Sequence, residues 1–119
     1  PVQWVSAPTN LKQGRLTLPQ LLESHPETDS VFCSSDLLAL GVIIEAHARG
    51  IAVPARLGVI GFGDLSFAAE LHPPLTTVRI EGTRIGEQAA AFIVRRAAGE
   101  TVEQRIVDIG YSIVSRGSA

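Results

Sequence analysis

Three kinds of side chain in this sequence could take part in covalent chemistry or bind a metal ion. Ser34 and Ser35 offer neighbouring hydroxyls, but the Gly-x-Ser-x-Gly setting of a hydrolase nucleophile is missing and no histidine is placed to activate them. The single cysteine, Cys33, lies in an apolar run, where desolvation raises the pKa of the thiol and makes it inert. The histidines have no metal-ligand spacing; they are His25, His47 and His72. We therefore expect neither an enzyme nor a metal or cofactor site, and helix capping as the role of the two serines.

Two short polar segments are better suited to binding a small molecule. Ser35 and Asp36 follow one apolar run, and residues 61–64, with the sequence Gly-Phe-Gly-Asp, follow another. The second segment lacks the third glycine and the Lys-Thr pair of a phosphate-binding loop. Two interpretations remain open for it: a tight turn in which Asp64 caps the next helical turn, or a loop whose backbone amides, freed by glycine, approach a ligand closely.

The elements around these two segments form a strand, a helix and a second strand. Residues 31–33 are wholly apolar, as in a strand buried on both faces, and residues 57–60 form another short buried strand. Between them, residues 37–49 are typical of a helix, with capping oxygens before it and Gly50 in a left-handed conformation after it. Parallel strands connected in this way bind ligands beyond their carboxyl ends. The two polar segments should therefore lie on one rim.

The N-terminal flank contains one further helix. We expect a strand over residues 2–5 and a loop over residues 7–13, followed by a helix with Leu18 on its apolar face. Pro19 leaves two possible starts for this helix. Either Thr17 caps it and Pro19 lies in its first turn, or the helix starts earlier and contains the proline.

The C-terminal flank mixes helical and extended patterns. The expected elements are a helical turn over residues 65–71, an extended run over 75–78, an amphipathic helix over 83–98, and strands over 105–109 and 111–114. Gly99 ends the helix, and Gly110 interrupts the last two strands with a bulge or bend.

Length and composition exclude several classes of protein. The chain has 119 residues, of which 45% are apolar and 18% charged, as in an ordinary globular domain. Its longest apolar run, residues 37–44, is far shorter than the roughly 18 residues that span a membrane. A net charge of −2 and a single lysine, Lys12, give no basic surface for nucleic acid. One cysteine excludes an internal disulfide. We expect a cytoplasmic protein that enters no membrane and does not bind DNA through this segment.

Five short motifs follow one another along the chain. They are Val31-Phe32-Cys33-Ser34-Ser35-Asp36, Leu38-Ala39-Leu40-Gly41, Arg49-Gly50-Ile51-Ala52-Val53-Pro54, Val59-Ile60-Gly61-Phe62 and Pro74-Leu75-Thr76-Thr77-Val78. In order and spacing they resemble the LacI/GalR family of bacterial repressors. The resemblance covers residues 2–118, and a series of this kind is far more specific than any one motif.

The resemblance implies an α/β fold in which a parallel sheet flanked by helices forms one lobe of a periplasmic-binding-protein-like fold. Residues 1–119 would then be the C-terminal part of an effector-binding domain, with the helix over 83–98 belonging to the other lobe. Closure of the two lobes over a small molecule would shift the balance between DNA-binding states. The family's N-terminal helix-turn-helix has no counterpart here, so DNA would be bound only through such a domain.

Two departures from the family's pattern bear on the effector. Ser35 stands where many members carry Asn or Asp, and Gly63 stands where they carry an Asp that grips a sugar. A carboxylate about 5 Å from a ligand carboxylate costs ~3 kcal/mol at an effective dielectric constant of 20, so a pocket for an anion should lack it. Together with residues 8–11 and 108–111, the Gly-Phe-Gly-Asp variant resembles the gluconate-type repressors. Loss of function is the competing explanation.

These features predict an effector-sensing segment of a bacterial transcriptional repressor, with a sugar acid such as gluconate as the ligand. The alternative is a periplasmic solute-binding protein for a sugar, although the segment 73–78 is more typical of a repressor. The effector-binding residues expected in this chain are Thr9, Asn10, Ser35, Asp36, Phe62, Gly63 and Asp64.

The same resemblance predicts a homodimer. Apolar residues one helical turn apart would face a two-fold partner; they are Leu40, Ile44, Phe67 and Leu71. The alternative is that these residues fill the core of their own lobe. The helix over 83–98 carries a second apolar stripe, which needs a cover of its own.

Overall fold

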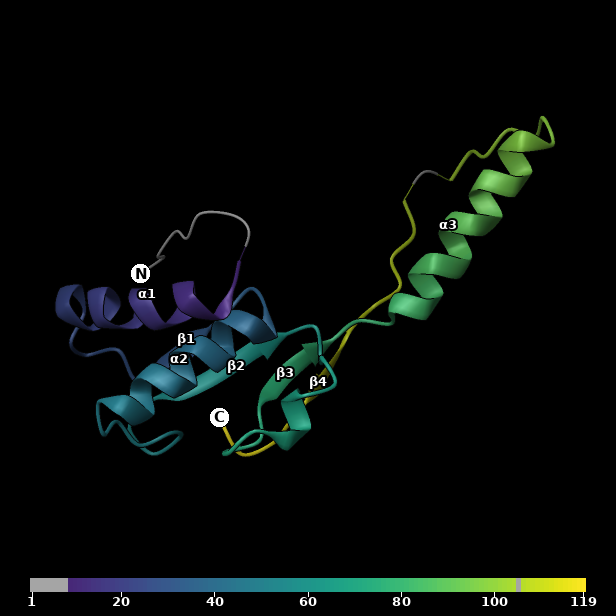
Figure 1. Cartoon of the computed structure of the whole chain (residues 1–119). Coiled ribbons are helices and arrows are strands. Elements are labelled where there is room, and N and C mark those ends of the chain that lie inside the picture. Colours follow the sequence, from purple (N-terminus) through teal and green to yellow (C-terminus); the bar gives the residue numbers. More distant parts are fainter. Residues whose placement is uncertain (1–8, 105) are drawn as a thin grey trace. The chain divides into compact units, whose positions relative to one another are not determined.

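The structure is a computed structural model that describes residues 9–104 and 106–119, and the chain divides into two units (Figure 1). The first unit runs to Arg79 and resumes at Ile113, and the second comprises Ile80–Ser112. The strand expected over residues 2–5 lies outside the described residues. The helix expected over 83–98 lies in the second unit, and its membership of another lobe stays a prediction.

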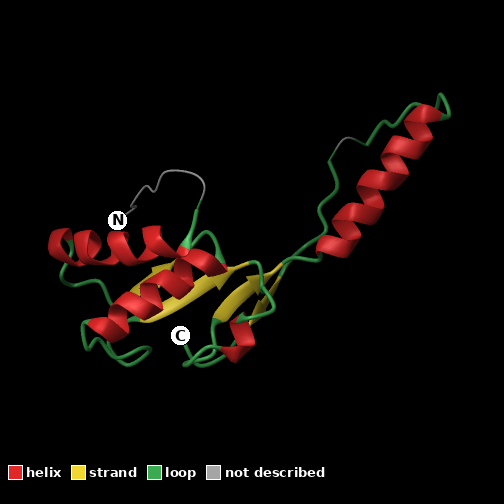
Figure 2. Ribbon diagram, viewed as in Figure 1, coloured by secondary structure: helices red, strands yellow, loops and turns green. Residues whose placement is uncertain are grey.

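A four-stranded sheet forms the centre of the first unit (Figure 2). Its strands, in spatial order, are β1 (Ser30–Phe32), β2 (Gly58–Phe62), β3 (Thr76–Arg79) and β4 (Ser112–Val114). β1 and β3 both pair with β2 in parallel. The expected α/β fold, with a parallel sheet flanked by helices, is therefore confirmed.

The helix between β1 and β2 forms as the sequence predicts. α2 covers Asp36–Ala48, and the Ser35 hydroxyl oxygen accepts a hydrogen bond of 3.2 Å from the backbone N–H of Leu38. Gly50, with φ +69°, takes the left-handed conformation that ends a helix without a Cβ clash. The short 3₁₀ helix η1 (Ala68–Glu70) lies within the helical turn expected over 65–71.

The first helix starts earlier than the loop prediction allows. α1 covers Leu11–Ser24, so residues 11–13 of the expected loop are helical and the cap expected at Thr17 is wrong, whereas the alternative with Pro19 inside the helix is right. The reason is a capping box. The side chain of Asn10 accepts from the N–H of Gln13, whose own side chain accepts from the N–H of Asn10.

Three strand predictions need correction. Phe32 is 63% exposed, so β1 is not buried on both faces; it is an edge strand of the described sheet. β2 runs on to Phe62 because Gly61 and Phe62 pair with β3. Residues 106–109 form no strand, and Ile106 is 86% exposed. Alternation of apolar and polar residues does not by itself produce a strand where no neighbouring strand supplies hydrogen bonds.

The second unit contains α3 (Gly82–Ala97), close to the predicted bounds. Its residues are amphipathic in sequence, yet none is buried, and Ile93 is 69% exposed. Gly99 follows with φ +83°. No helix in the described part of the chain is both long enough and apolar enough to cross a membrane.

The core of the first unit lies between α2, β2 and α1, and two glycines bring the helices together. Leu18, Ala39 and Val59 are buried there. A Cβ on Gly41 would overlap the backbone carbonyl oxygen of Leu11, and one on Gly14 would overlap that of Leu38. The two helix backbones are therefore in direct contact, and α1 begins beside the first turns of α2.

We predict that Gly41→Ala lowers the free energy of unfolding of the first unit by about 1–3 kcal/mol, because backbone atoms must move apart. Urea unfolding followed by circular dichroism measures this. Gly86→Ala, in α3, is the matched control, because nothing lies within 4 Å of its added methyl group. An alanine at position 41 that leaves the unfolding midpoint unchanged would contradict the helix contact.

Candidate functional site

The expected rim exists at one end of the first unit. The carboxyl ends of β2 and β3 and the first turns of α1 and α2 lie at this end (Figure 1). Ser35 and Asp36 begin α2, and Gly63 and Asp64 follow β2 directly. The two polar segments singled out in the sequence are thus neighbours across the sheet edge.

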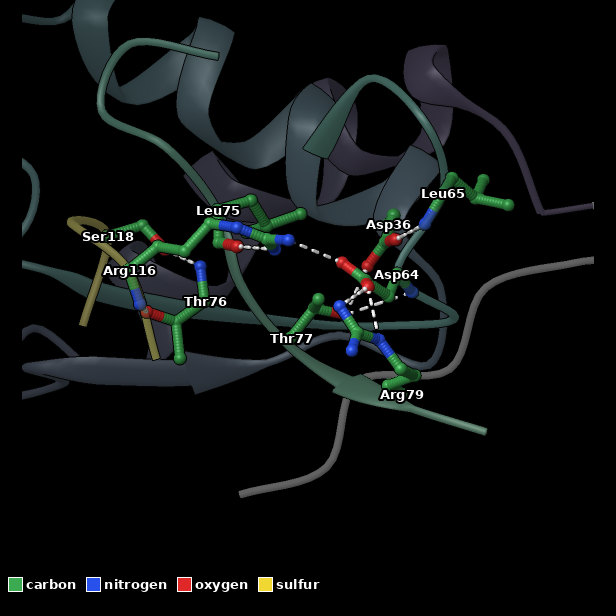
Figure 3. A network of polar contacts seen from close by, with 9 residues as sticks. All are labelled: Asp36, Asp64, Leu65, Leu75, Thr76, Thr77, Arg79, Arg116 and Ser118. Carbon is green, nitrogen blue, oxygen red and sulfur yellow. Dashed lines mark hydrogen bonds and ion pairs between the residues drawn. The ribbon is translucent and has the colours of Figure 1, made fainter. Parts of the chain in front are cut away.

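Asp36 connects the three segments that form this rim (Figure 3). It is fully buried, and its Oδ1 accepts a hydrogen bond of 2.6 Å from the hydroxyl of Thr77 in β3. Its Oδ2 accepts one of 2.7 Å from the backbone N–H of Leu65. A Cβ on Gly61 would overlap Oδ1, which explains the glycine in β2. Both carboxylate oxygens are thus engaged inside the protein, and Asp36 positions the rim from beneath.

The loop after β2 uses its backbone amides within the protein. The N–H of Gly63 donates to the Val78 carbonyl at 2.9 Å, and that of Asp64 donates to the Thr77 hydroxyl at 3.4 Å. The Leu65 amide donates to Asp36. These three amides are therefore not freed by glycine, and a loop that faces a ligand stays a prediction. Gly63 has φ +127°, a conformation that side chains rarely adopt, so the glycine serves the shape of the loop.

Asp64 binds two arginines, so the helix-capping role expected of its side chain is wrong, whereas the chain does bend at Gly63 directly after β2. Its Oδ2 accepts from Nε of Arg79 at 2.6 Å and forms an ion pair of 2.6 Å with Nη2 of the same group, while its Oδ1 accepts from Nη2 of Arg116 at 2.8 Å. Burial alone would raise the pKa of Asp64, but the hydrogen bonds from Arg116 and Arg79 outweigh burial and hold the pKa below its ordinary value.

The C-terminal segment supplies residues that sequence reasoning missed. Besides Asp64, Arg116 donates through Nη1 to the carbonyl of Leu75 at 2.8 Å. The buried Ser118 hydroxyl donates to the carbonyl of Val59 and accepts from the N–H of Thr76, so it joins β2 to β3. The missed signal is the polar pair Thr76-Thr77 in an otherwise apolar run, because buried hydroxyls need partners.

The remaining expected site residues have structural roles or exposed positions. Asn10 and Ser35 are the N-caps of α1 and α2. Thr9 is exposed just before α1, and Phe62 is half-buried at the end of β2. Contact of these residues with an effector stays a prediction.

The single cysteine is buried, in keeping with its place in an apolar run. Cys33 is 8% exposed, and burial, together with the nearby charge of Asp36, raises the pKa of the thiol to about 12. Within residues 9–104 and 106–119, no group of three His, Cys, Asp or Glu side chains could hold a metal ion.

The residues expected at a dimer interface are half-buried. Leu40 and Ile44 lie on α2, and Phe67 lies just before η1; none of the three belongs to the buried core cluster. Leu71 packs partly against that cluster. The seam expected from the sequence is therefore partly accessible, and the dimer itself stays a prediction.

Comparison with known proteins identifies the fold. A protein family described as a periplasmic binding protein-like domain matches residues 3–119. The chain belongs to this family. Its solved relatives include a LacI family transcriptional regulator from Silicibacter pomeroyi, with 26% identity and a TM-score of 0.82 over 98% of this chain and 42% of that one. The chain thus has the effector-binding type of domain found in LacI-family transcriptional regulators.

Several regulators are similar to this periplasmic binding protein-like chain. The regulator GntR of Pseudomonas aeruginosa is 35% identical over 111 residues, which are 93% of this chain and 32% of the relative. The structure of GntR from Chromobacterium violaceum has 38% identity and a TM-score of 0.85 over 93% of this chain and 41% of that one. The structure of a CelR–cellobiose complex has 30% identity and a TM-score of 0.87, and the match covers 92% of this chain and 34% of that one. The chain spans about a third of the length of the curated relatives it matches.

The ion pairs of Asp64 predict a specific dependence of stability on pH. Because the folded-state pKa lies below the ordinary value, this carboxylate stabilises the fold above that value, and the contribution is lost as pH falls through the folded-state pKa. We predict that Asp64→Asn lowers stability at neutral pH and flattens the decline of stability as the pH falls below the ordinary pKa of an aspartate.

Urea unfolding at a series of pH values measures both effects. Glu23→Gln is the matched control, because this exposed glutamate on α1 forms no ion pair with the described residues. An Asp64→Asn variant whose stability declines with acid as steeply as that of the unaltered protein would contradict the assignment.

Proposed function

We propose that this chain is the effector-sensing and dimerisation segment of a bacterial transcriptional repressor, and that its effector is a sugar acid such as gluconate. Effector binding by such a domain biases a regulator between a DNA-binding and a non-binding state, so the effector must prefer one of the two. The segment carries no catalytic role in this proposal.

The proposal of an anionic effector rests on the hydrogen bonds and ion pairs that the two carboxylates on the rim form within the protein. Asp36 is buried with both oxygens hydrogen-bonded, and Asp64 lies between two guanidinium groups. Position 63, where the resemblance places a sugar-gripping acid in other members, is glycine. Neither of these two carboxylates is therefore left uncompensated to repel a ligand carboxylate.

The relatives support regulation over transport. Those named above are described as transcriptional regulators, which favours a repressor over the alternative of a periplasmic solute-binding protein. The two GntR proteins agree with the gluconate-type resemblance, whereas the CelR structure is a complex with cellobiose, a neutral sugar. The charge of the effector is therefore the point that an experiment must decide.

We predict that the full-length protein binds gluconate more tightly than glucose in isothermal titration calorimetry. Gly63→Asp should weaken gluconate binding by roughly a hundredfold, since a new carboxylate about 5 Å from the ligand's own costs ~3 kcal/mol. Gly63→Ala is the control, because it imposes the same backbone strain at φ +127° without the charge. Equal or tighter binding of glucose by the unaltered protein would refute the anionic effector.

We also predict a dimer formed through the seam of Leu40, Ile44, Phe67 and Leu71. A glutamate in place of Leu40 should weaken the dimer, because its charge would be desolvated at a symmetric contact, while the half-buried position lets the fold survive. Leu16→Glu is the matched control, since Leu16 is 57% exposed on α1 and lies outside the seam. Light scattering checks both, and a monomeric unaltered protein or a dimeric Leu40→Glu variant would show that the surface is wrong.

A further inference from the structure

Arg79 differs from the other arginine on the rim in how much of its guanidinium group is used. Arg116 has a side chain only 17% exposed, and it binds both Asp64 and the backbone carbonyl of Leu75. Arg79 is 46% exposed at the carboxyl end of β3. Its Nε donates to Oδ2 of Asp64, its Nη2 forms an ion pair with the same oxygen, and none of the described residues accepts a hydrogen bond from its Nη1.

A guanidinium group held in this way is prepared to receive an anion. Its planar fork offers two edges that match a carboxylate, and here Asp64 occupies the edge that contains Nε. The edge formed by Nη1 and Nη2 remains for a second acceptor. The contact with Asp64 fixes the orientation of the side chain before any ligand arrives, which reduces the entropy lost on binding.

The charges around Arg79 also favour an anionic ligand. Two guanidinium groups share the one carboxylate of Asp64, so these three side chains together carry a net charge of +1. The other rim carboxylate, Asp36, is fully buried and bound to Thr77 and Leu65 rather than to either arginine. The end of β3 therefore offers a partly exposed positive charge at the edge where parallel sheets bind ligands (Figure 3).

We propose that Arg79 is the residue of this chain that binds the carboxylate of the effector, through Nη1 and Nη2, and that Asp64 orients it for this contact. This inference rests on the proposed function, because it requires an effector with a carboxylate. Arg79 then distinguishes a sugar acid from the corresponding neutral sugar, and Asp64 acts as a positioning residue.

Calorimetry with gluconate and glucose on the full-length protein tests the inference. Arg79→Gln should weaken gluconate binding roughly tenfold or more and change glucose binding much less, because only the charged contact is lost. Arg79→Lys keeps the charge but loses the planar fork, so its loss should be smaller. Arg84→Gln, on α3, is the control, because it removes the same single positive charge. The Arg84 side chain forms no ion pair with the described residues, so this variant should bind both ligands as the unaltered protein does.

The possible outcomes separate this inference from the proposed function. If the unaltered protein binds no gluconate, the proposed function and this inference both fail. If it prefers gluconate and Arg79→Gln keeps that preference, only the inference is overturned. A parallel loss of both ligands in Arg79→Gln and Arg79→Lys also overturns it, because Arg79 would then only hold the loop after β2. Thermal melting of each variant confirms that the comparison is made on folded protein.

Discussion

The buried carboxylate of Asp36 forms the contacts that connect the rim. Its two oxygens hold a hydroxyl of β3 and a backbone amide of the loop after β2, while its own backbone opens α2. A buried carboxylate is costly unless it is hydrogen-bonded, and a helix N-terminus favours a negative charge. Removing the Asp36 carboxylate would take the acceptor from both the Thr77 hydroxyl and the Leu65 amide. The three segments that form the rim are therefore mutually dependent.

The glycines and the C-terminal segment follow from this constraint. Gly61 leaves room for the Asp36 carboxylate, and Gly63 gives the loop a backbone conformation that closes the contact with Leu65. On the other side of β3, Ser118 and Arg116 satisfy buried backbone groups of β2 and β3 and bring a guanidinium to Asp64. The rim thus contains one carboxylate that is stabilised by hydrogen bonds and another that is paired with two arginines.

This division of charge gives the rim its chemical character. Asp36 is inaccessible, whereas the cluster of Asp64, Arg79 and Arg116 carries more positive than negative charge and reaches the surface through Arg79. The proposed acidic effector rests on this arrangement, because a charged acceptor forms a stronger hydrogen bond with a guanidinium than a neutral hydroxyl does.

The elements that could be predicted from the sequence are those whose signals are local. The cap at Ser35, the left-handed Gly50 and the apolar runs around them predict α2 and its two parallel strands, because each signal acts within a few residues. The order of short motifs also indicated the family. Tertiary structure decided what depends on distant partners. Residues 106–109 alternate between apolar and polar side chains but have no strand to pair with. Phe32 is exposed although its neighbours in the sequence are apolar. Asp64 meets Arg116 across 52 positions of sequence, and no local pattern predicts a contact made by the return of the chain.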